Sequence, residues 1–136
     1  MVETIEHAGT ILAIVVRANF RREGIEFFTP AEYSQQLAYM KRPGGYVIAP
    51  HVHNPVTREV KVTREVLFIR SGRVRVDLYG DDNRCVRSAV LGAGDVILLA
   101  SGGHGFEMLE ECEMIEVKQG PHVGEADKTR IEPASG

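Results

Sequence analysis

The fold of this chain is decided by the stretch Gly45–Gly72, which reads GYVIAPHVHNPVTREVKVTREVLFIRSG. Its two ends, 46–53 and 64–70, are rich in the β-branched and aromatic residues that favour strands. The first of these segments carries His51 and His53 at positions i and i+2. Side chains alternate between the faces of a strand, so two residues at this spacing point the same way. Neutral imidazole is the commonest metal ligand, so this stretch predicts two metal ligands on one strand face.

Two further residues outside the histidine pair are candidate ligands for the same ion. Glu65 stands at the beginning of the second segment and can supply a carboxylate oxygen. His104 comes later, directly after Gly102 and Gly103. We therefore expect His51, His53, Glu65 and His104 to form one metal site.

The rest of the chain is typical of a turn-rich β protein. It contains fourteen glycines and six prolines, more than a helical bundle tolerates. The clearest local signal is a hairpin in which 64–70 and 73–79 flank a turn at Ser71-Gly72. Short strands at hairpin spacing, with almost no helix, favour a β-sandwich or barrel. The expected strands are 10–18, 25–28, 35–41, 46–53, 64–70, 73–79, 84–91, 96–100 and 112–120.

Length and composition limit the classes of protein that fit. A chain of 136 residues has the usual size of one domain. The net charge of −3 gives no basic surface for nucleic acid, and two cysteines are too few for a disulfide framework. The apolar run 11–16 is too short to span a bilayer, and no basic segment precedes it. We expect a soluble, cytoplasmic protein with reduced thiols and no membrane partner.

The spacing within the opening stretch resembles the first motif of the cupin superfamily, G-x5-H-x-H-x(3–4)-E-x6-G. Gly45 precedes His51 by the right interval, and Gly72 follows Glu65 by the right interval. The gap from His53 to Glu65 is eleven residues, where the family has three or four. Glu59 lies nearer the family distance but has no glycine at the right offset after it, so we favour Glu65.

A second segment resembles the other cupin motif, G-x5-P-x-G-x2-H-x3-N. Gly94 opens it and His104 stands where the family has its histidine, whereas Ala100 and Met108 replace the proline and the asparagine. The resemblance covers about residues 36–118 of a single domain 1–136, with an N-terminal strand segment 1–35 and a loop tail 119–136. It implies an all-β double-stranded β-helix (jelly-roll) barrel.

The resemblance also implies the contents of that barrel. Its metal-binding members hold one divalent ion with three histidines and one carboxylate, here His51, His53, Glu65 and His104. Mixed nitrogen and oxygen ligation suits Fe, Mn, Ni, Cu or Zn and does not choose between them. The implied partner is a small-molecule ligand inside the barrel. Cupins also pair through an N-terminal strand, which makes a homodimer joined through 10–16 the expected assembly.

The reaction stays open at this point. The leading hypothesis is a metal-binding protein that binds or acts on a small polar metabolite. The alternatives are a nucleotide-sugar ketoisomerase, supported loosely by the tail 124–130, an iron-dependent dioxygenase, and a non-catalytic ligand-binding module. The insertion Asn54–Arg64 is expected to form a flap or edge strand that sets specificity.

The last expected strand bears on the ligand pocket, because Ile115 and Val117 alternate with Glu116 and Lys118. An apolar pair usually faces the interior. If the polar pair faced inward instead, it would line a ligand pocket.

Overall fold

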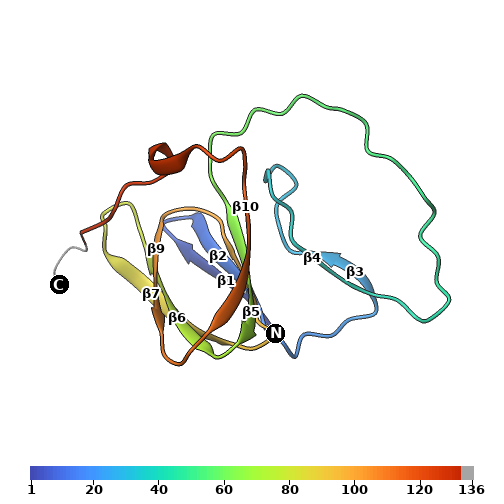
Figure 1. The fold of residues 1–136 in the computed structure, drawn as a ribbon, viewed down its shortest axis with the longest axis horizontal. Helices are drawn as coiled ribbons and strands as arrows, with labels where there is room; N and C mark the ends of the chain where they lie inside the picture. The colour runs from blue at the N-terminus through green and yellow to red at the C-terminus, as the bar shows by residue number, and fades with distance from the viewer. Residues whose placement is uncertain (133–136) are drawn as a thin grey trace. The chain divides into compact units, whose positions relative to one another are not determined.

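A computed structural model describes residues 1–132 as ten strands and one short 3-10 turn. Contacts divide the chain into two compact units. Figure 1 shows the strands, coloured by residue number along the chain. The main unit comprises residues 1–20 and the chain from Val62 onward, and the insert unit is Arg21–Lys61. The elements are β1 (Val2–His7), β2 (Thr10–Val16), β3 (Gly24–Phe27), β4 (Ala38–Lys41), β5 (Glu65–Ser71), β6 (Arg73–Tyr79), β7 (Cys85–Gly92), β8 (Val96–Leu99), β9 (Gly103–Met108), β10 (Glu113–Lys118) and η1 (Gly124–Asp127).

The main unit contains two antiparallel sheets. One has the order β1-β2-β8-β5-β10 and the other the order β7-β6-β9. The expected all-β class is confirmed, although the strands lie in separate sheets and not in one closed barrel. Among the described residues, no helix is long and apolar enough to cross a membrane.

The expected hairpin across Ser71-Gly72 is wrong in its pairing. Both strands exist, but β5 pairs with β8 and β10, whereas β6 pairs with β7 and β9. Gly72 has φ +83°, and a Cβ atom there would lie 2.0 Å from the carbonyl oxygen of Glu111. The chain therefore passes from one sheet to the other at Gly72, where only glycine fits.

The N-terminal strand β1 was missed from the sequence because Ile5 is its only buried residue. It joins β2 through Ala8 (φ 51°) and Gly9 (φ 78°), the two positive φ angles of a type I′ turn. β2 therefore lies between β1 and β8. The expectation that 10–16 joins a partner's sheet as a free edge is wrong, because both sides of β2 are already paired. The homodimer itself stays a prediction.

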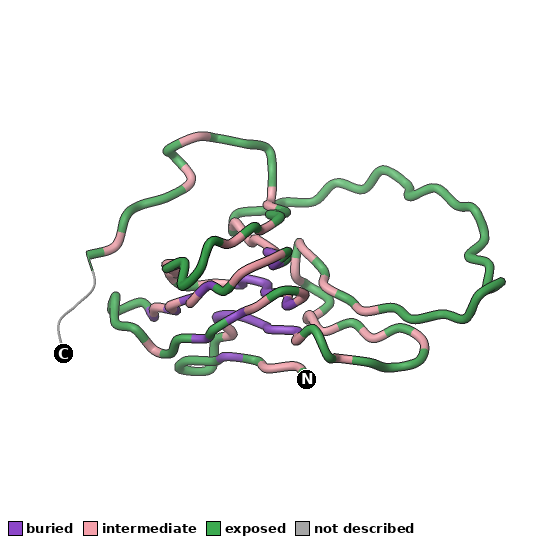
Figure 2. The backbone as a smooth tube through the Cα atoms, turned by 60° about the horizontal axis from the view of Figure 1, so that its bottom comes forward, coloured by how far each residue is buried: buried purple, intermediate pink, exposed green. Residues whose placement is uncertain are grey.

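The insert unit contains one antiparallel hairpin, β3 with β4, in the register Gly24↔Lys41 to Phe27↔Ala38. Residues 42–61 form no strand, and every one of them is exposed, as the green tube in Figure 2 shows. The expected strand 46–53 is therefore wrong. Pro43, Pro50 and Pro55 lack the N–H that a sheet ladder requires, and strand propensity alone does not form a strand without a paired neighbour.

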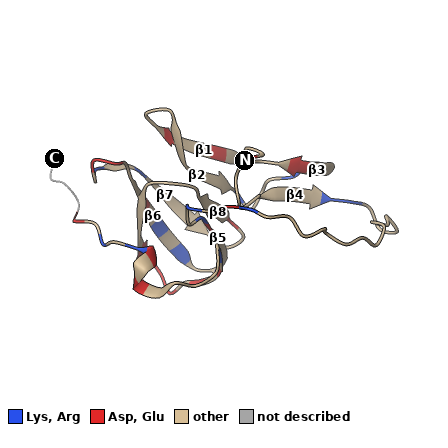
Figure 3. Cartoon of the chain, turned by 90° about the horizontal axis from the view of Figure 1, so that it is seen from above, with Lys and Arg blue, Asp and Glu red and all other residues tan. Residues whose placement is uncertain are grey.

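Alternation of apolar and polar residues builds the core of the main unit. On β6, Val74, Val76 and Leu78 are fully buried. The residues that alternate with them, among them Arg73 and Arg75, point to the opposite face. Figure 3 shows these arginines as blue bands on β6. The buried side chains of β6 meet those of the five-stranded sheet, including Leu67, Ile69, Ile97 and Leu99.

One end of the main unit is held by Asp95, which is 8% exposed. Its carboxylate accepts hydrogen bonds from the backbone N–H of Ala18 (2.7 Å) and of Gly92 (2.8 Å). The guanidinium of Arg17 donates to Asp95 (3.2 Å) and to the carbonyl of Val90 in the other sheet (2.7 Å). This network ties the end of β2 to the turn between β7 and β8.

The sheet change at Gly72 yields a stability prediction. We expect Gly72→Ala to lower the free energy of unfolding by more than about 3 kcal/mol, because the added methyl group meets backbone at a left-handed position. Gly9→Ala is the matched control, since its φ is also positive but nothing lies within 4 Å. It should cost about 1 kcal/mol. Urea denaturation measures both, and equal losses would contradict the steric explanation.

Candidate functional site

The inner face of the five-stranded sheet changes from apolar to polar along one row. Ala13, Leu99, Glu65 and Lys118 stand opposite one another on β2, β8, β5 and β10. Residues opposite each other in an antiparallel pair share a face. Ala13 and Leu99 are buried in the core, so Glu65 and Lys118 continue the same face at the edge of the sheet.

The next row places a second polar residue of β10 on this face, because Glu116 stands opposite the buried Leu67. Ile115 and Val117 point outward and are 49% and 57% exposed. The usual arrangement, with the apolar pair inside, is therefore wrong for this strand. Glu116 remains exposed because β10 is an edge strand.

His104 faces these residues from the other sheet. It stands opposite the fully buried Leu78 in the β6–β9 pair and therefore shares its inward face. Its Nε2 atom lies 3.8 Å from Oε1 of Glu65. Two ligands predicted from distant parts of the sequence thus meet inside the main unit. We call the group Glu65, His104, Glu116 and Lys118 the polar mouth.

Burial holds both central groups toward their uncharged forms. It is the main cause that lowers the pKa of His104 below its ordinary value, and Lys118 and Lys128 lower it further. Burial also raises the pKa of Glu65, and the nearby carboxylate of Glu116 adds to this effect. With a neutral imidazole, the 3.8 Å contact between Glu65 and His104 is not an ion pair, and it is too long for a hydrogen bond.

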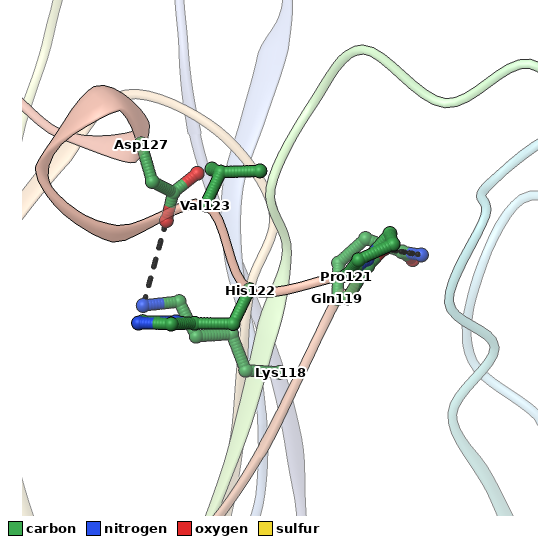
Figure 4. Close-up of a pocket in the computed structure, with 7 residues that line it drawn as sticks. Lys118, Gln119, Pro121, His122, Val123 and Asp127 are labelled. Atoms are coloured by element: carbon green, nitrogen blue, oxygen red, sulfur yellow. Dashed lines mark hydrogen bonds and ion pairs between the residues drawn. The ribbon is translucent and has the colours of Figure 1, made fainter.

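The C-terminal tail contributes to the same region. Lys118 Nζ lies 4.0 Å from Glu65 Oε1 and 3.4 Å from Asp127 Oδ2, so it stands between the two carboxylates. Asp127 also accepts a hydrogen bond from the hydroxyl of Thr63. Figure 4 shows the ion pair between Lys118 and Asp127 beside a hollow of about 140 Å³. The lining residues are Lys118, Gln119, Gly120, Pro121, His122, Val123 and Asp127.

The two remaining predicted ligands, His51 and His53, lie in the exposed segment of the insert unit. Their rings are adjacent, with centroids 5.3 Å apart, although no strand holds them. Nδ1 of His51 lies 2.8 Å from the carbonyl oxygen of Ala49. The carbonyl can only accept, so Nδ1 carries the proton and Nε2 keeps its lone pair when the ring is neutral.

The chemistry of these donors fits a divalent transition metal, because it combines imidazole nitrogens with one carboxylate. The hydrogen bond from His51 to Ala49 is of the kind that fixes the tautomer of a metal-binding histidine. Among residues 1–132, however, no group of three or more histidine, cysteine, aspartate or glutamate side chains is arranged to hold a metal ion. The four predicted ligands form two pairs, one in each unit.

Sequence reasoning missed two residues near the polar mouth, Asp127 and Thr63. Thr63 lies inside the opening stretch and Asp127 inside the tail 124–130, but local spacing could not predict a hydrogen bond between residues 64 positions apart. The sequence could give an inward-facing Lys118 only as an alternative. Which side chains of β10 face inward depends on its register with β5, and the sequence does not fix that register.

Comparisons of the chain with protein-family models, with curated proteins and with solved structures gave no match. The functional interpretation therefore depends on the residues and their geometry.

The pKa of Glu65 yields a prediction about stability. A raised folded-state pKa means that stability falls as pH rises from the ordinary glutamate value through the folded value. We expect Glu65→Gln to raise the free energy of unfolding at pH 7 by on the order of 1 kcal/mol, and to change it little near pH 4. Urea denaturation in the presence of a chelator measures this difference.

Glu113→Gln is the matched control, because Glu113 lies on the same pair of strands but is exposed. It should leave the free energy of unfolding unchanged at both pH values. A loss of stability in Glu65→Gln at pH 7 would show that the carboxylate is satisfied in the fold and would contradict the pKa argument.

Proposed function

We propose that this protein is a cupin-like, metal-binding protein whose polar mouth binds or acts on a small polar metabolite. The observation that carries the proposal is the approach of Glu65 and His104 from two different sheets. The motif spacing around Gly45–Gly72 and the all-β architecture support the same conclusion.

The electrostatics of the polar mouth favour a binding role over a structural one. Partial burial of a carboxyl group that faces an imidazole too distant for a hydrogen bond costs stability. Residues whose pKa values are shifted by burial and by neighbouring charges gather at functional sites more often than elsewhere. Glu65 and His104 meet this description, and both are among the ligands implied by the cupin resemblance.

The four residues that the cupin resemblance implies, His51, His53, Glu65 and His104, would hold one Fe, Mn, Ni, Cu or Zn ion. Such an ion, when bound, supplies Lewis-acid chemistry and open positions for a ligand. Burial favours the neutral form of His104, which is the form that binds a metal. The contact between Nδ1 of His51 and the Ala49 carbonyl leaves Nε2 as the nitrogen of that ring available to a metal. Lys118 provides positive charge beside the carboxylate of Glu65.

A second candidate function is proton transfer of the ketoisomerase type, without a metal. The specific observation in its favour is that burial raises the pKa of Glu65 and lowers the pKa of His104, which faces it. A carboxylic acid facing a neutral imidazole can act as a general acid with a general base. Exchange of substrate protons with deuterium from the solvent, in protein containing no metal, is the result expected for this candidate.

Metal analysis tests the leading proposal. Protein purified without a histidine tag and loaded with Mn(II) or Fe(II) should hold about one ion per chain. His53→Ala and Glu65→Gln should each reduce metal binding at least about tenfold, as loss of a ligand does. Plasma mass spectrometry and calorimetric titration measure content and affinity.

His7→Ala is the control, because His7 is an exposed residue of β1 and outside the proposed ligand set. It should leave metal content unchanged. Retention of the ion by His53→Ala would show that the assigned site is wrong.

A further inference from the structure

The tail segment 121–131 passes over the strand that carries His104. Ile131 marks the contact, because a Cβ atom on Gly103 would lie 2.1 Å from Cδ1 of Ile131. The side chain of Ile131 therefore occupies the space that a side chain at position 103 would fill. We call residues 121–131 the strap. Gly103 is adjacent to His104, so the strap covers the edge of the polar mouth.

A polar contact fastens the strap at a second point. Asp127, at the end of η1, is paired with Lys118 and accepts a hydrogen bond from Thr63, and its side chain is 18% exposed. Those two interactions lower the pKa of Asp127, so the group is ionised at neutral pH. The residue that follows, Lys128, lies close enough to Glu65 and His104 to affect their pKa values.

We propose that the Asp127 carboxylate occupies the position of a ligand's carboxylate, and that a small carboxylic acid displaces it from Lys118 and Thr63, which releases the strap. The inference rests on the proposed function in one respect, namely that the polar mouth is the ligand site.

The donors that hold Asp127 define the ligand class. The ammonium of Lys118 and the hydroxyl of Thr63 both donate to a carboxylate in the structure, and a carboxylate from solution offers the same acceptors. The hollow of about 140 Å³ beside this pair leaves room for a small molecule only. Lys128 adds a second positive charge for an anion that enters, as its effects on Glu65 and His104 indicate.

The two partners of this ion pair should respond in opposite ways when acetate is the probe. Asp127→Asn removes the competing charge, so acetate should bind about two- to fivefold more tightly. Lys118→Gln removes the donor, so acetate should bind more weakly by a similar factor. The imidazole resonances of His104 report binding, and metal-free protein is used throughout. The result therefore stays readable even if the metal proposed above proves to be absent.

Trypsin reports on the strap itself, because Lys128 and Arg130 are cleavage sites within it. Acetate, Asp127→Asn and Lys118→Gln should each speed cleavage at these two residues. Gly103→Ala should do the same without changing any charge, since the new methyl group displaces Ile131. Cleavage after Arg58 and Lys61 in the insert unit provides an internal reference that should not change.

The Lys41–Glu23 pair, at 2.8 Å in the insert unit, supplies the matched control. Lys41→Gln should alter neither acetate binding nor strap cleavage. The proposal is overturned if Asp127→Asn fails to tighten acetate binding, if Lys118→Gln fails to weaken it, or if acetate slows cleavage of the strap. Tighter binding of inorganic phosphate than of acetate would overturn the assignment to carboxylates.

Discussion

The backbone turn at Gly72 is the constraint on which the rest of the main unit depends. A left-handed residue packed against the Glu111 carbonyl leaves no room for a side chain, and it sends the chain from β5 in one sheet to β6 in the other. If β5 and β6 had paired as a simple hairpin, their residues would share one sheet. Because they do not, Glu65 on β5 faces His104 on β9 across the core.

The register of β10 with β5 decides which of its side chains face inward. Its register with β5 places Glu116 opposite Leu67 and Lys118 opposite Glu65. The two polar residues therefore face inward, while Ile115 and Val117 are left exposed. Burying Ile115 and Val117 would stabilise the fold, but this strand turns Glu116 and Lys118 toward Glu65 instead. Stability alone does not explain this orientation.

Strand periodicity and turn chemistry predict much of the main unit from the sequence. The strands β5, β6, β7 and β8 lie where alternation and glycine turns place them. What could not be predicted was pairing, because local pattern does not say whether a glycine turn closes a hairpin or changes sheets. The strand predicted for residues 46–53 is wrong for another reason. Their strand propensity is high, but prolines within and beside the segment lack the N–H group needed for pairing, and the segment is exposed and has no partner strand.

For the candidate site, sequence spacing identified Glu65 and His104, which the fold brings together, but not Asp127, whose contacts with Lys118 and Thr63 depend on the path of the tail. Glu65, which is half-buried, differs in its surroundings from the buried carboxylate of Asp95. Asp95 accepts hydrogen bonds from two backbone N–H groups and from Arg17, so its burial is compensated. Glu65 has the ammonium of Lys118 at 4.0 Å and the neutral imidazole of His104 at 3.8 Å, and its pKa is raised by burial and by the charge and hydrogen bond of the nearby Glu116. One fold thus contains a buried carboxylate whose hydrogen bonds hold the structure and a half-buried one whose pKa is raised, and groups with shifted pKa values occur more often at sites that bind ligands.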